Sequence, residues 1–452
     1  MNELQWPMDY LKDVKEQYEN YPYPFRDPEE EKTRLLATED GYLDKINHYC
    51  YAGRQNFDNF RVLIAGGGTG SAAVFLAEQL RDHRNAEIVY LDISSASMNV
   101  ARKRAEIRGL SRITWVNNSI LNLPELNLGP FDYINCVGVL HHLEDHYKGL
   151  RILHGQLQDD GCMGVMVYGR HARTAVYQMQ ELMRLVNTDE TNMQAKVDNT
   201  KIILSSLPPS NSFKRCEREW LTEVEEYGDI GLYDLFLHSH DHGFDVLEIY
   251  DWVESCGLHL VDFIGPEFES RIGYEPKTFI THPGLLKKIS ALPRPRQQAI
   301  AEILSGRIQR HSFYLSRRPT PQAKPDDLHN VPFFFKTTPQ GLSQAIDGNP
   351  GKTITLTSPD RISVHLTPSR FTSKFLHHLD GAASIKTIFA AIRRDLDAPH
   401  LSDGELLDEF KSLYKIFNDI GWMLLRHDSV GPCPPPAGLQ ARVSKRYSPE
   451  NS

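Results

Sequence analysis

The chain has 452 residues, of which 40% are hydrophobic and 24% charged, and its formal net charge at pH 7 is −9. This length favours two domains over one, and the negative charge disfavours general binding to nucleic acids or anionic membranes. No apolar run is long enough to span a bilayer, and the polar N-terminus is not typical of a secretory signal. The six cysteines show no CxxC spacing, which predicts reduced thiols in a cytoplasmic protein, without a disulfide framework or a metal site.

The first unusual segment runs from Tyr18 to Pro28, where aromatic residues stand among prolines. Proline fixes its own φ and restricts the residue before it, so this segment should be stiff and extended. It can be a lid over a cofactor or substrate, a strap whose aromatic side chains pack on the core, or both. We assign residues 1–55 to this N-terminal lid or strap.

A glycine-rich turn follows in the segment Phe60–Gly70, FRVLIAGGGTG. Val62–Ala65 predicts a short buried strand, and Ser71–Leu80 predicts a helix. Glycine lets the chain turn sharply and lets a ligand approach the backbone, and the N–H groups at the start of the helix can face polar ligand atoms. The pattern is typical of a nucleotide-like cofactor site, although a tight turn that binds nothing has the same form.

A carboxylate ends the second predicted strand, Ala86–Asp92, 22 residues after Gly70. At this spacing an acid can accept hydrogen bonds from both hydroxyls of a ribose. The alternative is that Asp92 caps the next helix, because Asp also favours the N-cap position.

Three more strands are expected at 112–116, 131–137 and 161–168, with a helix at 95–108 and a turn at Leu123-Pro124. Strands that alternate with helices predict an α/β fold with a parallel sheet covered by helices on both faces. Ligands of such sheets bind beyond the carboxyl ends of the strands. The glycine turn, Asp92, Ser119 and His141 all fall at such ends.

The ordered motifs VLIAGGGTG, YLDIS, NNSILNLP and FDYINCVGVLHHL resemble the class I S-adenosylmethionine-dependent methyltransferases, strongly over about 61–170 and weakly to about 318. The resemblance implies a methyltransferase domain at 56–318 with a Rossmann-like seven-stranded sheet. Helix 245–256 and an antiparallel pair, 258–264 and 310–316, would complete it. Insertions at about 171–244 and 265–306 would build a substrate lid, and S-adenosylmethionine would be the cofactor.

The resemblance also implies the cofactor contacts. The glycine turn would lie under the methionine part, Asp92 would bind the ribose, and the following residue would pack on the adenine. Further residues would lie at the adenine edge and near the sulfonium. The complete set is Gly66, Gly67, Gly68, Gly70, Asp92, Ile93, Asn118, Ser119, Ile120, Val137 and Gly138. This chain departs from the family at Ile64, where an acid is usual, and at Ser119, where Asp is usual.

Methyl transfer from a sulfonium is an in-line displacement, so the enzyme mainly positions the nucleophile and excludes water. A base is needed only if the nucleophile carries a proton at working pH. His141 could act as that base, because histidine titrates near neutrality, or could orient its loop. His142 more often has a structural role. Tyr168 could orient the acceptor, and His141 and Tyr168 are the predicted catalytic residues.

A second, smaller unit is expected after the linker at 319–330. Alternating residues at 352–357 and 361–366 predict a hairpin, and apolar stripes after Ser384 and from Leu406 to Ile420 predict two helices. The resemblance here is to winged-helix units, so we predict a small α+β domain at 331–430. Its 11 Lys and Arg balance 11 Asp and Glu, which favours a protein partner or a homodimer over DNA. Residues 431–452 should be disordered.

Three functions remain open on these grounds. The first is a methyltransferase that acts on a protein side chain or a small molecule. The second is a catalytically weak, cofactor-binding scaffold that recruits a partner, which the missing acid at Ile64 and the neutral accessory domain favour. The third is an NAD-dependent oxidoreductase, but its GxGxxG fingerprint would need a glycine at Ser71.

Overall fold

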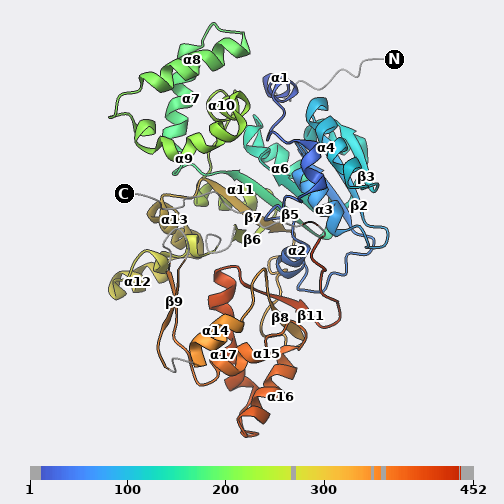
Figure 1. The fold of residues 1–452 in the computed structure, drawn as a ribbon, viewed down its shortest axis with the longest axis vertical. Coiled ribbons are helices and arrows are strands. Elements are labelled where there is room, and N and C mark those ends of the chain that lie inside the picture. The colour runs from blue at the N-terminus through green and yellow to red at the C-terminus, as the bar shows by residue number, and fades with distance from the viewer. Residues whose placement is uncertain (1–11, 266–270, 348–350, 358–362, 437, 439–452) are drawn as a thin grey trace.

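The computed structural model describes residues 12–265, 271–347, 351–357, 363–436 and 438, and Figure 1 shows their arrangement. At the centre is a seven-stranded sheet of order β3-β2-β1-β4-β5-β7-β6. Its strands are β1 (Arg61–Ala65), β2 (Glu87–Asp92), β3 (Ile113–Asn117), β4 (Phe131–Val137), β5 (Leu157–Tyr168), β6 (His259–Ile264) and β7 (Arg310–Ser316). β7 runs antiparallel to β5 and to β6, whereas the pairs among β1–β5 are parallel. The predicted α/β class, sheet and antiparallel pair are confirmed.

Strand β1 is apolar on both faces because both are covered, as is usual for a parallel strand. Val62 and Ile64 enter one hydrophobic core, and Leu63 and Ala65 enter the other. The first core is completed by α2 (Leu43–Cys50), α3 (Ser71–Gln79) and α4 (Ser95–Ile107), and the second by α6 (His146–Gly155) and α11 (Val246–Ser255).

The predicted element boundaries are mostly close to the observed ones. β4 and β7 match residue for residue, and β5 begins four residues earlier than the expected Gly161. The segment expected to turn at Leu123-Pro124 instead starts a short helix, α5 (Leu123–Leu126). Proline is tolerated there because the first turn of a helix needs no N–H donor at that position.

The insertion at 171–244 folds into helices α7 (Thr174–Val186), α8 (Met193–Ser206), α9 (Ser212–Tyr227) and α10 (Asp229–Phe236). They share an apolar core that includes Val176, Phe213 and Trp220. The insertion at 265–306 supplies α12 (Pro283–Ser290) and α13 (Arg294–Ser305). In Figure 1, α7–α10 lie at the end of the molecule opposite to the C-terminal unit.

The C-terminal unit contains two antiparallel strand pairs, β8 (Asn330–Phe334) with β11 (Met423–His427) and β9 (Ile354–Thr357) with β10 (Ser363–Leu366). The second pair confirms the two predicted strands over 354–357 and 363–366, whereas residues 358–362 of the predicted hairpin lie outside the described residues. The two expected helices are confirmed as α16 (Ile385–Asp395) and α17 (Asp403–Asp419). Two further helices, α14 (Gln340–Asp347) and α15 (Thr372–His378), were not predicted. Of the predicted tail, 437 and 439–452 lie outside the described residues.

The C-terminal unit is joined to the domain of the seven-stranded sheet by α2. The Leu425 N–H donates to Nδ1 of buried His48 over 3.0 Å, and His48 Nε2 lies 3.2 Å from the Tyr414 hydroxyl. Burial lowers the pKa of His48 to about 3, so the imidazole stays neutral at this interface. All six cysteines are free thiols. In the part of the chain that the structure describes, no helix is both long and apolar enough to cross a membrane.

Candidate functional site

The glycine turn between β1 and α3 is closely packed on several sides. A Cβ at Gly66 would come within 2.3 Å of the Val139 side chain, and one at Gly70 within 2.6 Å of the Ala101 Cβ. Gly70 also has φ +92°, which disfavours any L side chain. The turn therefore requires glycine for packing against the loop after β4 and against α4, whether or not a ligand is bound.

Backbone N–H groups of the turn bind the end of β2. Gly66 and Gly67 donate to the Leu91 carbonyl over 2.8 and 3.1 Å. The Gly68 N–H donates to Oδ2 of Asp92 over 2.7 Å. These bonds hold the glycine turn and Asp92 in one rigid group.

Asp92 lies at the predicted ribose position and is 8% exposed. Its Oδ1 accepts the Ser94 N–H over 2.8 Å. Burial raises the pKa of Asp92 to about 6, against the opposing effect of these backbone hydrogen bonds. The N-cap of α4 is Ser94, whose Oγ accepts the Ser97 N–H, so the interpretation of Asp92 as the cap is wrong. An ionised carboxylate has about four acceptor sites, which leaves capacity for sugar hydroxyls.

The loops after β2 and β3 lie side by side at the predicted adenine edge. The Asn118 N–H donates to the Asp92 carbonyl over 3.0 Å. Ser119 is buried and its Oγ accepts the Leu121 N–H over 3.2 Å. Ile93 is half-buried and Ile120 is buried. The structure thus places the two loops that carry the predicted adenine-side residues next to each other.

The predicted sulfonium and catalytic residues lie at the end of β4, in the loop after it, and at the end of β5. Val137 and Gly138 are half-buried, and His141 is fully buried. The His141 and Tyr168 rings meet with their centroids 4.3 Å apart, so the two predicted catalytic residues are neighbours. Burial lowers the pKa of His141 well below its ordinary value. A neutral, weakly basic imidazole is better suited to orient the loop or the acceptor than to act as a general base.

A histidine-rich loop, His238–His242, packs against this pair, and sequence analysis missed it. His238 stacks on His142 with ring centroids 3.8 Å apart. The His242 N–H donates to the His141 carbonyl over 3.0 Å. The run HSHDH at 238–242 was visible in the sequence, but only the tertiary fold places it beside β4.

The segment Tyr18–Pro24 lies directly on the glycine turn and the Asp92 loop. The Tyr18 carbonyl accepts the Ser94 hydroxyl over 2.9 Å, and the Pro24 carbonyl accepts the Thr69 hydroxyl over 2.7 Å. The Glu19 carboxylate accepts the N–H groups of Ser95 and Ala96 at the start of α4, each over 2.9 Å. A helix N-terminus favours such a negative charge.

The other side of this segment faces the helical insertion. Tyr21 packs on Tyr233 with ring centroids 5.2 Å apart, and Tyr23 packs edge-on against Tyr227 at 6.0 Å. Figure 1 shows α1 (Lys12–Asn20) passing close to α10 and α4. The N-terminal segment therefore links the insertion to the carboxyl edge of the sheet.

A buried carboxylate also lies near Ile64, where the family usually has an acid. Ile64 pairs with Asn135 across β1 and β4, and the Asn135 amide donates to the carboxylate of Asp40. The Tyr133 and Tyr314 hydroxyls donate to the Asp40 carbonyl over 2.7 and 3.1 Å. Burial raises the pKa of Asp40 to about 6. The stretch before α2 thus supplies, through Asp40, a carboxylate that no motif indicated.

Comparisons with known proteins agree with this arrangement. A family model described as a methyltransferase domain matches residues 63–163. The Synechococcus sp. protein "Uncharacterized protein syc1184_c" is 30% identical over 309 residues, which are 68% of this chain and 71% of that protein. The Escherichia coli (strain K12) tRNA 5-carboxymethoxyuridine methyltransferase is 29% identical over 112 residues, 25% of this chain and 41% of that enzyme.

The solved structure of PKMT2 from Rickettsia typhi shares the fold over most of the chain. The TM-score is 0.60 at 16% identity, and the match covers 86% of this chain and 76% of that one. A second structure holds PKMT2 in complex with AdoHcy. The chain belongs to the class I S-adenosylmethionine-dependent methyltransferases. S-adenosylmethionine is the cofactor of this methyltransferase, and neither the scaffold nor the oxidoreductase hypothesis is favoured.

The residues at the carboxyl edge of the methyltransferase fit this cofactor. Asp92 keeps acceptor capacity beyond its two backbone bonds, and half-buried Ile93 offers an apolar surface beside it. The half-buried Val137 ends β4 at the same edge, and the half-buried Gly138 follows it.

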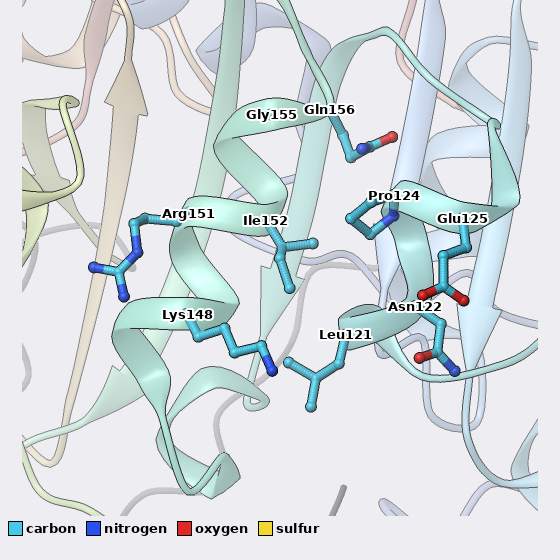
Figure 2. A pocket seen from close by; sticks show the side chains of 9 residues that line it. All are labelled: Leu121, Asn122, Pro124, Glu125, Lys148, Arg151, Ile152, Gly155 and Gln156. Carbon is cyan, nitrogen blue, oxygen red and sulfur yellow. The ribbon is translucent and has the colours of Figure 1, made fainter. Parts of the chain in front are cut away.

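A surface hollow of 660 Å³ lies elsewhere on the methyltransferase, between α5 and α6 (Figure 2). Lys148 and Arg151 of α6 and Glu125 of α5 are among its lining residues, and the Lys148 side chain extends toward Leu121. None of the predicted site residues lines it. The hollow is therefore separate from the carboxyl edge that the motifs identify.

Proposed function

We propose that this methyltransferase transfers the methyl group to a protein side chain or a small molecule bound beside Gly138, His141 and Tyr168. The main support is the meeting of Asp92, the glycine turn, the β4 loop and the N-terminal segment at one edge of the sheet. The helical insertion lies over this edge through Tyr21 and Tyr23, as a substrate lid would.

We propose the following cofactor contacts. Asp92 binds the ribose hydroxyls and the glycine turn of Gly66, Gly67, Gly68 and Gly70 lies under the methionine part. Ile93, Asn118, Ser119 and Ile120 surround the adenine, and Val137 and Gly138 lie near the sulfonium. Asp40 supplies the negative charge that Ile64 lacks. The segment 18–24 acts as a lid that excludes water, which favours displacement at the sulfonium.

The acceptor class follows from charge. Phosphate contacts by Lys and Arg dominate nucleic-acid affinity, and this chain carries a net charge of −9. The tRNA methyltransferase of Escherichia coli is similar over only a quarter of the chain. A protein or small-molecule acceptor is therefore favoured over RNA.

The experiment that tests the proposed function is calorimetry followed by a transfer screen. We expect S-adenosylmethionine and S-adenosylhomocysteine to bind the purified full-length protein and NADH not to bind. Labelled methyl groups should then enter proteins or metabolites of a cell extract. Absence of binding by either sulfur compound would refute the assignment, binding without any transfer would favour the scaffold, and label confined to RNA would refute the acceptor class.

Cofactor affinity is expected to depend on pH through Asp92. Its pKa of about 6 in the free protein means that the carboxylate is protonated below pH 6. Because ribose hydroxyls bond best to the ionised form, affinity for S-adenosylhomocysteine should fall by up to about tenfold per pH unit below that value. Calorimetry from about pH 5 to about pH 8, a window that spans this pKa, gives the profile. Because the pKa of Asp40 is also about 6, Asp92→Asn and Asp40→Asn should each reduce the slope, and Asp92→Asn should reduce it more. An unchanged slope in Asp92→Asn would contradict the role of Asp92.

The C-terminal unit extends the proposal to partners. We propose that residues 331–430 form a winged-helix-like module that binds a protein partner or a second copy of the chain, supported by its balanced charge. Light scattering of the full-length protein measures its molar mass and so tests whether it forms a homodimer.

The free thiols support a cytoplasmic setting.

A further inference from the structure

A cluster of potential metal ligands lies beside the β4 loop and comes from two segments far apart in the sequence. His141 and His142 belong to the short turn Leu140–His142, and Asp241 belongs to the histidine-rich loop before α11. One ring nitrogen or carboxylate oxygen from each of the three lies within 4.8 Å of the others.

The His141 ring and one carboxylate oxygen of Asp241 are buried without a hydrogen bond. His141 is 0% exposed, and within the described residues neither of its ring nitrogens has a hydrogen-bond partner. The Asp241 side chain is also 0% exposed, and its Oδ1 is likewise unpartnered there. Buried polar atoms of folded proteins nearly always have partners. These atoms therefore point to a ligand between them.

Outer hydrogen bonds orient His142 and Asp241 for a shared ligand. The His142 Nδ1–H donates to the His240 carbonyl over 2.8 Å, which leaves the lone pair on Nε2. Oδ2 of Asp241 accepts the Gln180 amide over 3.0 Å and lies 3.6 Å from the Arg173 guanidinium. Metal-binding histidines and carboxylates are typically fixed by such outer hydrogen bonds.

We propose that His141, His142 and Asp241 bind one divalent first-row transition metal ion, with Zn²⁺ as its representative. Two imidazoles and one carboxylate suit these metals and leave at least one coordination position open. Ligand atoms about 2.1 Å from a tetrahedral ion are about 3.4 Å apart. The ligand atoms of the cluster, which lie within 4.8 Å of one another, would approach each other by up to about 1.4 Å on binding the ion.

The position of the ion suggests a role in methyl transfer, and this role rests on the proposed function. His141 follows Gly138 by three residues, beside the predicted path of the methyl group. An acceptor hydroxyl at the open position would lose its proton to solvent more readily. The acceptor oxygen then bonds to the methyl carbon, and the carbon–sulfur bond breaks with its electron pair left on sulfur.

A neighbouring cluster of His146, His242 and Glu248 supplies the control. There Oε1 of Glu248 already bonds to Nε2 of His242 over 2.7 Å, and Oε2 pairs with Arg170. His242 is also about one third exposed. Both oxygens of Glu248 are thus already engaged by cations or donors, although His146 Nε2 is unpartnered within the described residues. Because the carboxylate is taken up in this way, His242→Gln should leave metal binding unchanged.

The test uses full-length protein treated with a chelator and then titrated with Zn²⁺ by equilibrium dialysis and with Co²⁺ by visible absorption. We expect one equivalent to bind, with a ligand-field spectrum for Co²⁺. His142→Phe keeps a ring stacked on His238, and Asp241→Asn keeps the bond from Gln180. Each should weaken metal binding by at least about tenfold, whereas Asp241→Glu should restore part of it.

Three results would overturn the proposal: no binding by the wild-type protein, wild-type affinity in both ligand variants, or loss of the metal in His242→Gln alone. Thermal unfolding and calorimetry with S-adenosylhomocysteine show that each variant is folded. Metal-free protein should bind S-adenosylhomocysteine with unchanged affinity, because Gly68 and Asp92 do not belong to the cluster. Failure of cofactor binding would therefore count against the proposed function and leave the metal result standing.

Discussion

Replacing Asp92 with asparagine is expected to weaken the binding of S-adenosylmethionine and S-adenosylhomocysteine by at least about tenfold. A hydrogen bond to a charged group contributes roughly 1.5–3 kcal/mol, and the ribose would lose such bonds. The substitution also turns one carboxylate oxygen into an NH₂ group, so the N–H of either Gly68 or Ser94 loses its present acceptor. Calorimetry with both ligands at a pH above 7 measures the effect.

A matched control distinguishes a role of Asp92 in ribose binding from its role in holding the backbone of the glycine turn. Asp132 likewise accepts a backbone N–H, that of Arg61 over 2.7 Å, but at the amino end of β4. Asp132→Asn should destabilise the fold without changing cofactor affinity. In addition, 2′-deoxy-S-adenosylhomocysteine should bind wild type less tightly than the parent compound, and Asp92→Asn should bind the two alike. If the variant still discriminated between them, the ribose would not be bound by Asp92.

The local part of the fold follows from the sequence. The apolar run before Gly66 predicts β1, and its two buried faces explain why no alternation was present. Helix starts at Ser384 and Asp245 were also predictable, because their side chains cap the first turn. The proximity of the glycine turn and Asp92 was also predictable, because the carboxyl ends of parallel strands lie at the same edge of the sheet.

The parts of the site that could not be predicted depend on contacts between segments that are distant in the sequence. Asp40 reaches the register of Ile64 from 24 residues upstream, and a strand pattern carries no signal for such a contact. Asp241 meets His141 only because the insertion 171–244 folds back over β4. Likewise, the prolines around Tyr23 predict stiffness, but not that its carbonyl would lie 2.9 Å from a Cβ at Gly68. At these three contacts the local sequence carries no information about which distant residue will be the partner.

Replacing Glu31 with alanine is expected to destabilise the protein by about 3–5 kcal/mol. Glu31 is buried in the turn Pro28–Lys32 and bonds to Nε and Nη2 of Arg104 over 2.9 and 2.6 Å, and also to Arg108. Arg104 is 1% exposed, and burial lowers its pKa against the opposing effect of Glu31. Removing one partner of a buried ion pair leaves an uncompensated buried charge, which gives the stated cost.

Urea denaturation measures the free energy of unfolding of each variant, and the adjacent Glu30 provides the control. Its ion pair with Arg34 is about 40% exposed on both sides, so Glu30→Ala should cost no more than about 1 kcal/mol. The double variant Glu31→Ala/Arg104→Met should recover part of the loss, because it removes the second charge as well. Equal costs for Glu31→Ala and Glu30→Ala would contradict the assignment.

Loss of Glu31 should also reach the cofactor site. Nη1 of Arg104 donates to the Thr69 carbonyl over 2.7 Å, and the Thr69 hydroxyl donates to the Pro24 carbonyl. Arg104 therefore holds the glycine turn at the point where the N-terminal segment crosses it. Because ordering this turn would then have to accompany binding, S-adenosylhomocysteine should bind Glu31→Ala less tightly than Glu30→Ala, even at temperatures where both variants remain folded.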